Sequence, residues 1–475
     1  MAQPKRIYSE CLVRNWSRLR YYVRGTQISQ RMRDSIRKPF VRTSREQNRL
    51  LRKEIDQNIR YLYLDVFWAA IFMAVMAFNV TYALRLGASN QMIGWLSSIP
   101  SLFAMLMMLP SARFLERRKN QSLWINRSLL IGRFLFLGVA LVPWIFRRYQ
   151  AELVIWILIL RSIPMNFFSA GFSPLLARAI PARDRARVLG NRSIINSAVV
   201  AVSTYLLGIW LDAGGKISWA NFPLNYQVMY ILGAAAALVS VYYVSRLSVP
   251  QQEVKQTQDK PNKKQKISLI KAVADFRQST KDNRAFVRMV INTLVFNLGA
   301  WFVMSLYTIF FVKELQASDG WVGLNTTLAN IGVIAGNLLW RRIIAKVGDQ
   351  RALLLSLPLS ASYAFLVALF PNLSWILVWG ILINLVNPGV NLSHYNILVD
   401  SCPEDRMASY LAIFSTIMNV GAFVSPMLGI ALSELIGVTW VLIIGGSIRL
   451  FGALLFFIWK VDEKQAPGQS LALTG

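Results

Sequence analysis

The sequence predicts an all-α, polytopic membrane protein with twelve transmembrane helices arranged as two pseudo-symmetric six-helix bundles. Three observations support this fold class. Of the 475 residues, 55% are hydrophobic and 16% are charged, whereas soluble chains carry nearer a quarter charged residues. The apolar residues fall in runs of about 20, the length at which an α-helix crosses about 30 Å of hydrocarbon. The two halves of the chain also resemble each other at equivalent places.

The pattern of apolar runs divides the chain into five parts. A basic arm (1–60) precedes six predicted spans (61–247), a polar, Lys-rich linker (248–285), six more spans (286–460) and a short tail (461–475). The middle of the linker is amphipathic, and we expect it to lie along the membrane surface. The predicted spans are 61–84, 91–110, 123–146, 151–178, 188–211, 226–247, 286–312, 320–342, 351–370, 373–397, 407–431 and 437–459.

The distribution of Lys and Arg predicts the topology. Residues 1–60 alone contain sixteen of them. Basic loops stay in the cytoplasm, so we expect both termini in the cytoplasm and the chain in the cell (inner or plasma) membrane. The net charge of +29 is then a topology signal, and no nucleic-acid partner is expected. The loops on the opposite side contain five basic residues: Arg85, Arg147, Arg148, Lys216 and Lys313.

The arm admits two interpretations. Arg42, Arg45, Arg49 and Arg52 recur at helical spacing and form a basic stripe that leads to the first span. Such a stripe is typical of a helix held near the anionic headgroups of a lipid bilayer. The alternative is an arm that recruits a protein partner. The first apolar run begins near residue 61, too late for a cleavable signal peptide, so none is expected.

Two internal repeats suggest duplicated halves. Residues 89–94 (SNQMIG), before the second span, match residues 318–323 (SDGWVG), before the eighth. The pair Asp184-Arg185 after the fourth span matches Asp405-Arg406 after the tenth. Duplicated halves are a mark of secondary transporters, whose site lies between the repeats near the bilayer midplane.

Small residues predict which helices join the halves. Spans two, five, eight and eleven carry small residues four apart, which let helix backbones approach closely in lipid. We therefore expect these four helices to pack the two halves together. The residues are Gly94 and Ser98; Ser193, Ser197 and Ala201; Gly332 and Gly336; and Gly421, Ser425 and Gly429.

These features together resemble the major facilitator superfamily over residues 61–460. The family has six plus six helices, a basic central loop, and a charged signature after the second and eighth spans. Residues 112–119 (ARFLERRK) keep the acid and the basic cluster of that signature but not its glycines. Residues 341–349 (RRIIAKVGD) keep one glycine and have alanine at the acid position. The resemblance implies a cytoplasmic gate formed by Glu116, Arg117, Asp184, Arg185, Asp405 and Arg406.

The resemblance also implies that the first, fourth, seventh and tenth helices line a central substrate cavity. Polar residues concentrate on these spans, and Pro164 and Pro388-Gly389 are expected to interrupt the fourth and tenth. The alternative role for each buried asparagine is a hydrogen bond between helices. The expected cavity residues, including Arg133 on the third span, are Asn79, Arg133, Arg161, Asn166, Asn297, Asn384, Asn387 and His394.

Charged residues within the spans indicate the kind of solute. Arg133, Arg161 and Arg449 lie near mid-span, where a charge costs at least about 3 kcal/mol. Asp65 is predicted near a span end, and we expect no carboxylate at the depth of the arginines. A buried cation without a counterion favours an anionic or strongly hydrogen-bonding solute. The alternative is that the arginines bond to backbone carbonyls or reach the interface.

The sequence lacks the residue patterns of an enzyme. No nucleotide-binding, metalloprotease or nucleophile-elbow motif is present. One histidine and two distant cysteines, Cys11 and Cys402, do not make a zinc site or a structural disulfide. We therefore expect no cofactor, no metal and no catalytic residue.

The favoured function is a secondary active or facilitative transporter that moves a small solute, anionic or amphipathic, by alternating access. The alternative is a membrane assembly protein that keeps the fold and recruits a partner through residues 1–60. Uniport, exchange and proton coupling through Asp65 or His394 remain open, since an imidazole with its usual pKa of about 6.5 suits proton exchange.

Overall fold

The computed structural model describes residues 30–116, 118, 120–215, 221–248, 283–403 and 406–459. The predicted surface helix of the linker, the C-terminal tail and the first 29 residues lie outside the described residues. Residues 1–58 form one compact unit and residues 59–475 a second. The second unit contains the predicted spans and every predicted site residue.

The described chain is helical throughout. Eleven helices are long and apolar enough to cross a membrane within the described residues. The 27-residue helix α4 is the twelfth, so the predicted number of spans is confirmed. The first six spans are α2 (Gln30–Met76) with α3 (Asn79–Arg85), α4 (Asn90–Glu116), α5 (Gln121–Ile145), α6 (Gln150–Ala179), α7 (Ala182–Gly214) and α8 (Leu224–Ser245). The second six are α10 (Arg284–Ile309) with η2 (Phe310–Glu314), α11 (Asp319–Val347), α12 (Asp349–Leu369), α13 (Leu373–Asp400), α14 (Met407–Ile436) and α15 (Val438–Ile458).

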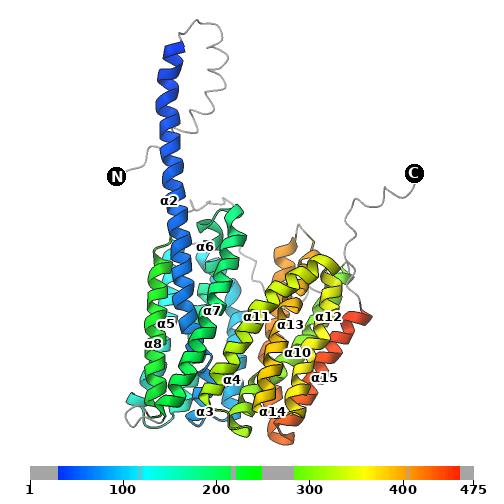
Figure 1. The fold of residues 1–475 in the computed structure, drawn as a ribbon. Coiled ribbons are helices and arrows are strands. Elements are labelled where there is room, and N and C mark those ends of the chain that lie inside the picture. Colours follow the sequence, from blue (N-terminus) through cyan, green and yellow to red (C-terminus); the bar gives the residue numbers. More distant parts are fainter. Residues whose placement is uncertain are drawn as a thin grey trace, which may run out of the picture. The chain divides into compact units, whose positions relative to one another are not determined.

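The two halves repeat the same helix packing. In the first half α6 packs on α4 and α5, and α5 packs on α8. In the second half α13 packs on α11 and α12, and α12 packs on α15, which are the equivalent pairs. The helices of the first half stand side by side with those of the second in Figure 1. The prediction of two pseudo-symmetric bundles is confirmed.

The bundles meet through the four predicted helices. Helix α4 packs on α14, and α7 packs on α11. Gly94 of α4 faces Ile430 of α14, as its small size predicts. The contact between α7 and α11 rests on glycines outside the predicted small-residue motifs, because a Cβ on Gly208 would lie 3.1 Å from the Cα atoms of Gly320 and Gly323.

Other small-residue motifs pack within the second bundle and not between the bundles. Gly332 and Gly336 face the backbone of α13, and Gly429 faces the backbone of Phe302 in α10. The Ser425 hydroxyl donates to the Leu298 carbonyl of α10 at 2.8 Å. Spacing identified these close approaches correctly, but it does not specify which neighbouring helix makes them.

The predicted proline interruptions are wrong. Helix α6 runs unbroken through Pro164, and α13 runs unbroken through Pro388. Long membrane helices tolerate proline because neighbouring groups satisfy the freed backbone. The first span is interrupted instead, at a turn over Ala77 and Phe78, and the seventh ends in the π-helical segment η2. These two spans are pseudo-symmetry equivalents.

Candidate functional site

The apolar cores show where the bundles are joined. One buried cluster contains residues of both halves, such as Ile93, Leu306 and Ile430. A second cluster contains only residues of the second half, between Phe286 and Phe456. A third contains only residues of the first half. We call the end with the shared cluster, where α3 ends and α4 and α11 begin, the closed end.

Two polar contacts related by the internal repeat cross the closed end. Arg85, in the last turn of α3, forms an ion pair with Asp319 at 3.4 Å and donates to the Ala317 carbonyl at 3.0 Å. In the pseudo-symmetric position, the Lys313 ammonium donates to the Asn90 amide oxygen at 2.8 Å. We call these two contacts the clasp. One half of it carries a carboxylate and the other a neutral amide.

Two further contacts join the bundles beside the clasp, from residues of the repeated motif that are not equivalent to each other. The Ser318 hydroxyl donates to Asp212 at the end of α7 at 2.8 Å. On the other side, the Gln91 amide donates to Glu434 at the end of α14 at 3.1 Å. Ser318 also caps α11 by accepting from the Trp321 N–H, so the repeated motif both starts a helix and holds the bundles together.

Deeper contacts extend the closed end inward. The hydroxyls of Ser97 and Ser305 lie 2.6 Å apart across α4 and α10. Thr327 of α11 donates to the Ala201 carbonyl of α7 at 2.8 Å, and its hydroxyl lies 3.0 Å from that of Thr204. These neutral contacts are satisfied without water, which suits a seal in the membrane interior.

Of the residues predicted for a cytoplasmic gate, Asp184, Arg185 and Arg406 lie at the end opposite the clasp. Asp184 pairs with its neighbour Arg183 at 3.1 Å, and Arg185 donates to the Ala177 carbonyl of α6. Both of these contacts stay within the first bundle. Arg406 directly precedes the first residue of α14. Arg117, Asp405 and the side chain of Glu116 lie outside the described residues. The gate at this end stays a prediction.

Arg133 and Arg161 converge on one aromatic ring inside the first bundle. Their guanidinium carbons lie 3.8 Å and 5.1 Å from the ring centroid of Phe72 on α2. Both side chains are more than nine-tenths buried. Arg161 donates to the sulfur of Met76 at 3.2 Å, and a thioether is only a weak acceptor. The alternative of backbone partners for these two arginines therefore does not describe this structure.

A buried ion pair lies in the same bundle. Asp65 of α2 accepts from Arg192 of α7 at 3.0 Å and from Ser240 of α8 at 2.7 Å. Arg192 also donates to the Leu62 carbonyl at 2.6 Å. The depth of Asp65 relative to Arg133 and Arg161 stays a prediction, but the structure shows Asp65 in an ion pair with Arg192. Its Arg192 partner was not identified, because Arg192 stands near the predicted edge of its span.

Two predicted cavity residues of the second bundle, Asn387 and His394, contact neighbouring helices. The Asn387 amide oxygen accepts from Ser360, whose own hydroxyl accepts from Arg449 at 2.7 Å. This relay fixes the orientation of the Asn387 amide. His394 lies 2.7 Å from the Thr293 hydroxyl of α10.

The remaining predicted cavity asparagines differ in their partners. Asn384 bonds to the Gly380 carbonyl of its own helix, and Asn297 lies 3.9 Å from the sulfur of Met418. Asn79 accepts from the Tyr230 hydroxyl at 2.8 Å. The amide nitrogen of Asn166 is buried and has no acceptor among the described residues.

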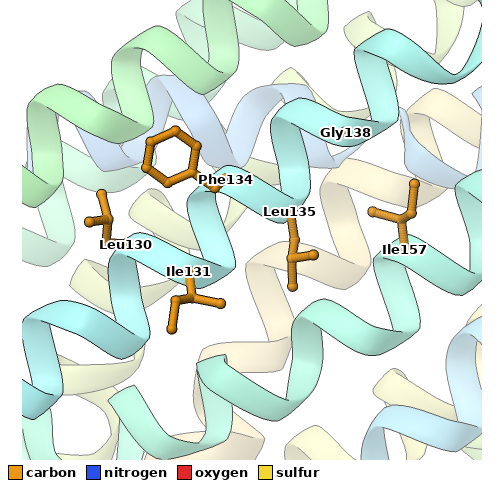
Figure 2. Close-up of a pocket in the computed structure, with 6 residues that line it drawn as sticks. All are labelled: Leu130, Ile131, Phe134, Leu135, Gly138 and Ile157. Carbon is orange, nitrogen blue, oxygen red and sulfur yellow. The ribbon is translucent and has the colours of Figure 1, made fainter. Parts of the chain in front are cut away.

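An apolar groove of about 350 Å³ lies between α5 and α6. Figure 2 shows Leu130, Ile131, Phe134 and Leu135 on one helix and Ile157 on the other. Ile131 and Phe134 are more than half exposed. Both helices are long enough to span a membrane, and the groove is lined by apolar side chains. We therefore expect the acyl chains of lipids, and not a polar solute, to contact it. Among the described residues, no group of three or more His, Cys, Asp or Glu side chains is placed to hold a metal ion.

Comparison with known proteins gives one consistent result. The chain matches the family model of the Major Facilitator Superfamily over residues 65–290 and 289–475. It is 23% identical to the staphylopine export protein of Staphylococcus aureus (strain Mu50 / ATCC 700699) over 414 residues, which cover 86% of this chain and 97% of that protein.

Solved structures share the fold at low identity. A bacterial homologue of the human lysosomal transporter Spinster, in an inward-facing and occupied conformation, has a TM-score of 0.60 at 13% identity and covers 86% of this chain and 98% of its own. The inward-open xylose transporter XylE from E. coli has a TM-score of 0.59 at 15% identity, covering 88% and 97%. The nucleoside transporter NupG has a TM-score of 0.65 at 13% identity, covering 84% and 99%.

Proposed function

Because this chain belongs to the Major Facilitator Superfamily and carries a small solute across a membrane, we propose that it does so by alternating access. The two bundles rock about a central site and expose it to each side of the membrane in turn. One observation carries the proposal: the bundles share an apolar core and a clasp at one end, but have separate cores at the other. Discrete contacts confined to one end are what a rocking pair of bundles must break.

The direction of opening follows from the charge distribution. Basic loops favour the cytoplasm, and they lie at the end opposite the clasp. We therefore propose that both termini are cytoplasmic, that the membrane is the cell membrane and that this conformation faces the cytoplasm. The export activity named for the staphylococcal relative supports outward movement as the direction to test first.

The predicted cavity residues remain our proposal for the solute site. Asn79 on α3, Asn166 on α6, Asn297 on α10 and Asn387 on α13 belong to the four cavity-lining helices. Their amides supply donors and acceptors, and the relay from Arg449 orients Asn387 with its oxygen held by Ser360. The arm residues Arg42 to Arg52 lie on helix α2. We propose that they contact the anionic headgroups of the lipid bilayer.

Distance measurements between spin labels test the rocking motion without a known solute. We would label Arg148 and Leu435 at the closed end in one protein, and Arg187 and Arg351 at the other end in a second. All four are exposed, and serine would replace Cys11 and Cys402. Alternating access predicts that the two distances change in opposite directions between conformations. Distances that lengthen or shorten together would contradict the proposal.

The clasp supplies the perturbation for this experiment. Asp319→Asn removes the ion pair with Arg85, whose side chain is 34% exposed against 12% for Asp319. A partly buried charged contact contributes about 1–2 kcal/mol, so the closed end should open more often, by about fivefold to thirtyfold. We expect a longer 148–435 distance and a shorter 187–351 distance in this variant. Arg183→Gln, which removes an exposed ion pair within one bundle, is the control and should leave both unchanged.

A further inference from the structure

The interior of the first bundle carries an excess of positive charge. Arg133 and Arg161 are buried there, the side chain of Arg192 is 13% exposed, and Asp65 pairs with Arg192. Asp65 is already engaged by Arg192 and Ser240, at 3.0 Å and 2.7 Å. Arg133 and Arg161 have no ion-pair partner of their own among the described residues. Two like charges in a medium of low dielectric constant repel each other strongly unless an anion accompanies them.

Both arginines have buried nitrogen atoms that donate a hydrogen bond to no acceptor among the described residues. Arg133 has no acceptor for Nε and Nη1 among the described residues, and Arg161 has none for Nε. Buried polar atoms without partners are rare in native proteins, and each one asks for a ligand or water. A guanidinium group donates and never accepts. The complementary partner is therefore a group that only accepts, which is the property of an ionised oxyanion or a halide.

Aromatic contacts hold both guanidinium groups in place. Arg133 lies 3.8 Å above the centroid of Phe72, and Arg161 lies between Phe72 and Phe136, at 5.1 Å and 5.6 Å. Phe72 and Phe136 themselves pack edge to face at 4.6 Å. These ring contacts leave Nε and Nη1 of Arg133 and Nε of Arg161 without an acceptor among the described residues.

Met76 is a weak acceptor for one of these arginines. It is half-buried on α2, just before the turn that interrupts the first span, and its sulfur is the acceptor of Arg161. Methionine has three rotatable bonds and adapts its shape at low cost. An anionic group can displace this weak acceptor and offer a stronger one.

We propose that Arg133 and Arg161 bind an anionic group inside the first bundle, beside the interruption of the first span. The inference deepens the proposed function, on which it rests, by assigning the solute an acidic group such as a carboxylate or phosphate. The same chemistry is offered by an inorganic anion that stays bound and by an anionic lipid headgroup. The three sources differ in size and in how they reach the site, and the experiment separates them.

The test measures stabilisation of the purified full-length protein by anions. The protein is placed in nanodiscs of phosphatidylcholine in a buffer of low ionic strength, and the sodium salt of chloride, phosphate, succinate or citrate is added at matched ionic strength. A ligand that binds the native state raises the melting temperature with its concentration. Stabilisation by chloride alone identifies a resident inorganic anion and overturns the assignment to the solute, whereas stabilisation by phosphate or by the carboxylates supports an acidic solute group. Stabilisation only in phosphatidylglycerol nanodiscs identifies a headgroup and overturns the assignment to the solute.

Substitutions show whether the anion-dependent stabilisation arises from Arg133 and Arg161. Arg133→Met and Arg161→Met should each require at least about tenfold more anion for the same stabilisation, since each removes charge-assisted hydrogen bonds. Arg118→Met is the matched control, because Arg118 lies over the rings of Phe114 and Trp124 in the same bundle but is exposed. It should behave as the parent protein does. Met76→Ala keeps both arginines and should bind as well or more tightly, so it tests the site even if an arginine variant fails to fold.

Two results would overturn the inference. One is that no anion stabilises the parent protein more than it stabilises Arg133→Met, Arg161→Met or, if neither folds, Phe72→Leu. The other is that Arg118→Met loses the response to the same extent. The spin-label distances are measured independently of these anions, so a failed anion site accompanied by opposed distance changes would leave alternating access standing.

Discussion

Asp65→Ala is expected to lower the free energy of unfolding of the first bundle by about 3–5 kcal/mol. The Asp65 carboxylate accepts from Arg192 at 3.0 Å and from Ser240 at 2.7 Å, so it ties α2 to α7 and to α8. Its side chain is 6% exposed and that of Arg192 is 13% exposed. Without this carboxylate, the largely buried Arg192 cation loses its counterion. The first bundle then holds three positive charges, on Arg133, Arg161 and Arg192, that no carboxylate compensates.

Unfolding of the purified protein in a denaturing detergent, followed by circular dichroism, measures this loss. Ser240→Ala removes one neutral donor from the same carboxylate and should cost about 1 kcal/mol. Asp65→Ala combined with Arg192→Met removes both charges and should recover much of the lost stability. If the double variant were as unstable as the sum of the single variants, the ion pair would not be the source of the effect.

The fold was predictable because its strongest determinants are local. A run of apolar residues long enough to cross the bilayer identifies each span by itself, without knowledge of its neighbours. The duplication was visible in the repeated motif at Ser89 and Ser318. In the structure both copies begin a helix, and each contributes one residue to the clasp, Asn90 or Asp319. A helix start depends on a few adjacent residues, which a single sequence displays.

Packing partners were less predictable, for the opposite reason. The motif at Gly332 and Gly336 correctly indicated a close approach, but spacing alone does not distinguish α13 from a helix of the other bundle. Pro164 lacks the N–H of an interior helix position, but the sequence does not show whether neighbours compensate. Both questions depend on residues far away in the chain, which a pattern read along one segment does not contain.

In the candidate site, too, local features were predictable and long-range contacts were not. The depth of Arg133 and Arg161 follows from their place within apolar runs, and both are indeed buried. Their shared contact with Phe72 depends on how three helices meet. The clasp was missed although Arg85 and Lys313 stood out as rare basic residues on their side. The equivalence of Asp319 and Asn90 in the repeat, 229 positions apart, was the available signal.

Gly208→Leu is expected to prevent the closed end from closing. A Cβ on Gly208 would lie 3.1 Å from the Cα atoms of Gly320 and Gly323 and 3.2 Å from the Asp319 carbonyl oxygen. These are backbone atoms of α11, which cannot swing aside as a flexible side chain can. Overpacking of this kind costs about 1–3 kcal/mol or more, so the closed-end population should fall by about 5-fold to 150-fold. The spin-label pair at 148 and 435 would report the opening.

The position of Gly208 separates a conformational effect from a general loss of stability. If the bundles rock, the leucine disfavours only the state in which α7 and α11 touch, so the protein should stay folded while the 187–351 distance shortens. If the bundles form one rigid body, the same leucine should destabilise the whole molecule without any change at the far end. Gly138→Leu is the matched control, because a Cβ there makes ordinary contact with Ile157 in the lipid-facing groove. Shortening at the far end in Gly208→Leu, but not in Gly138→Leu, therefore requires that the two ends of the molecule are mechanically coupled.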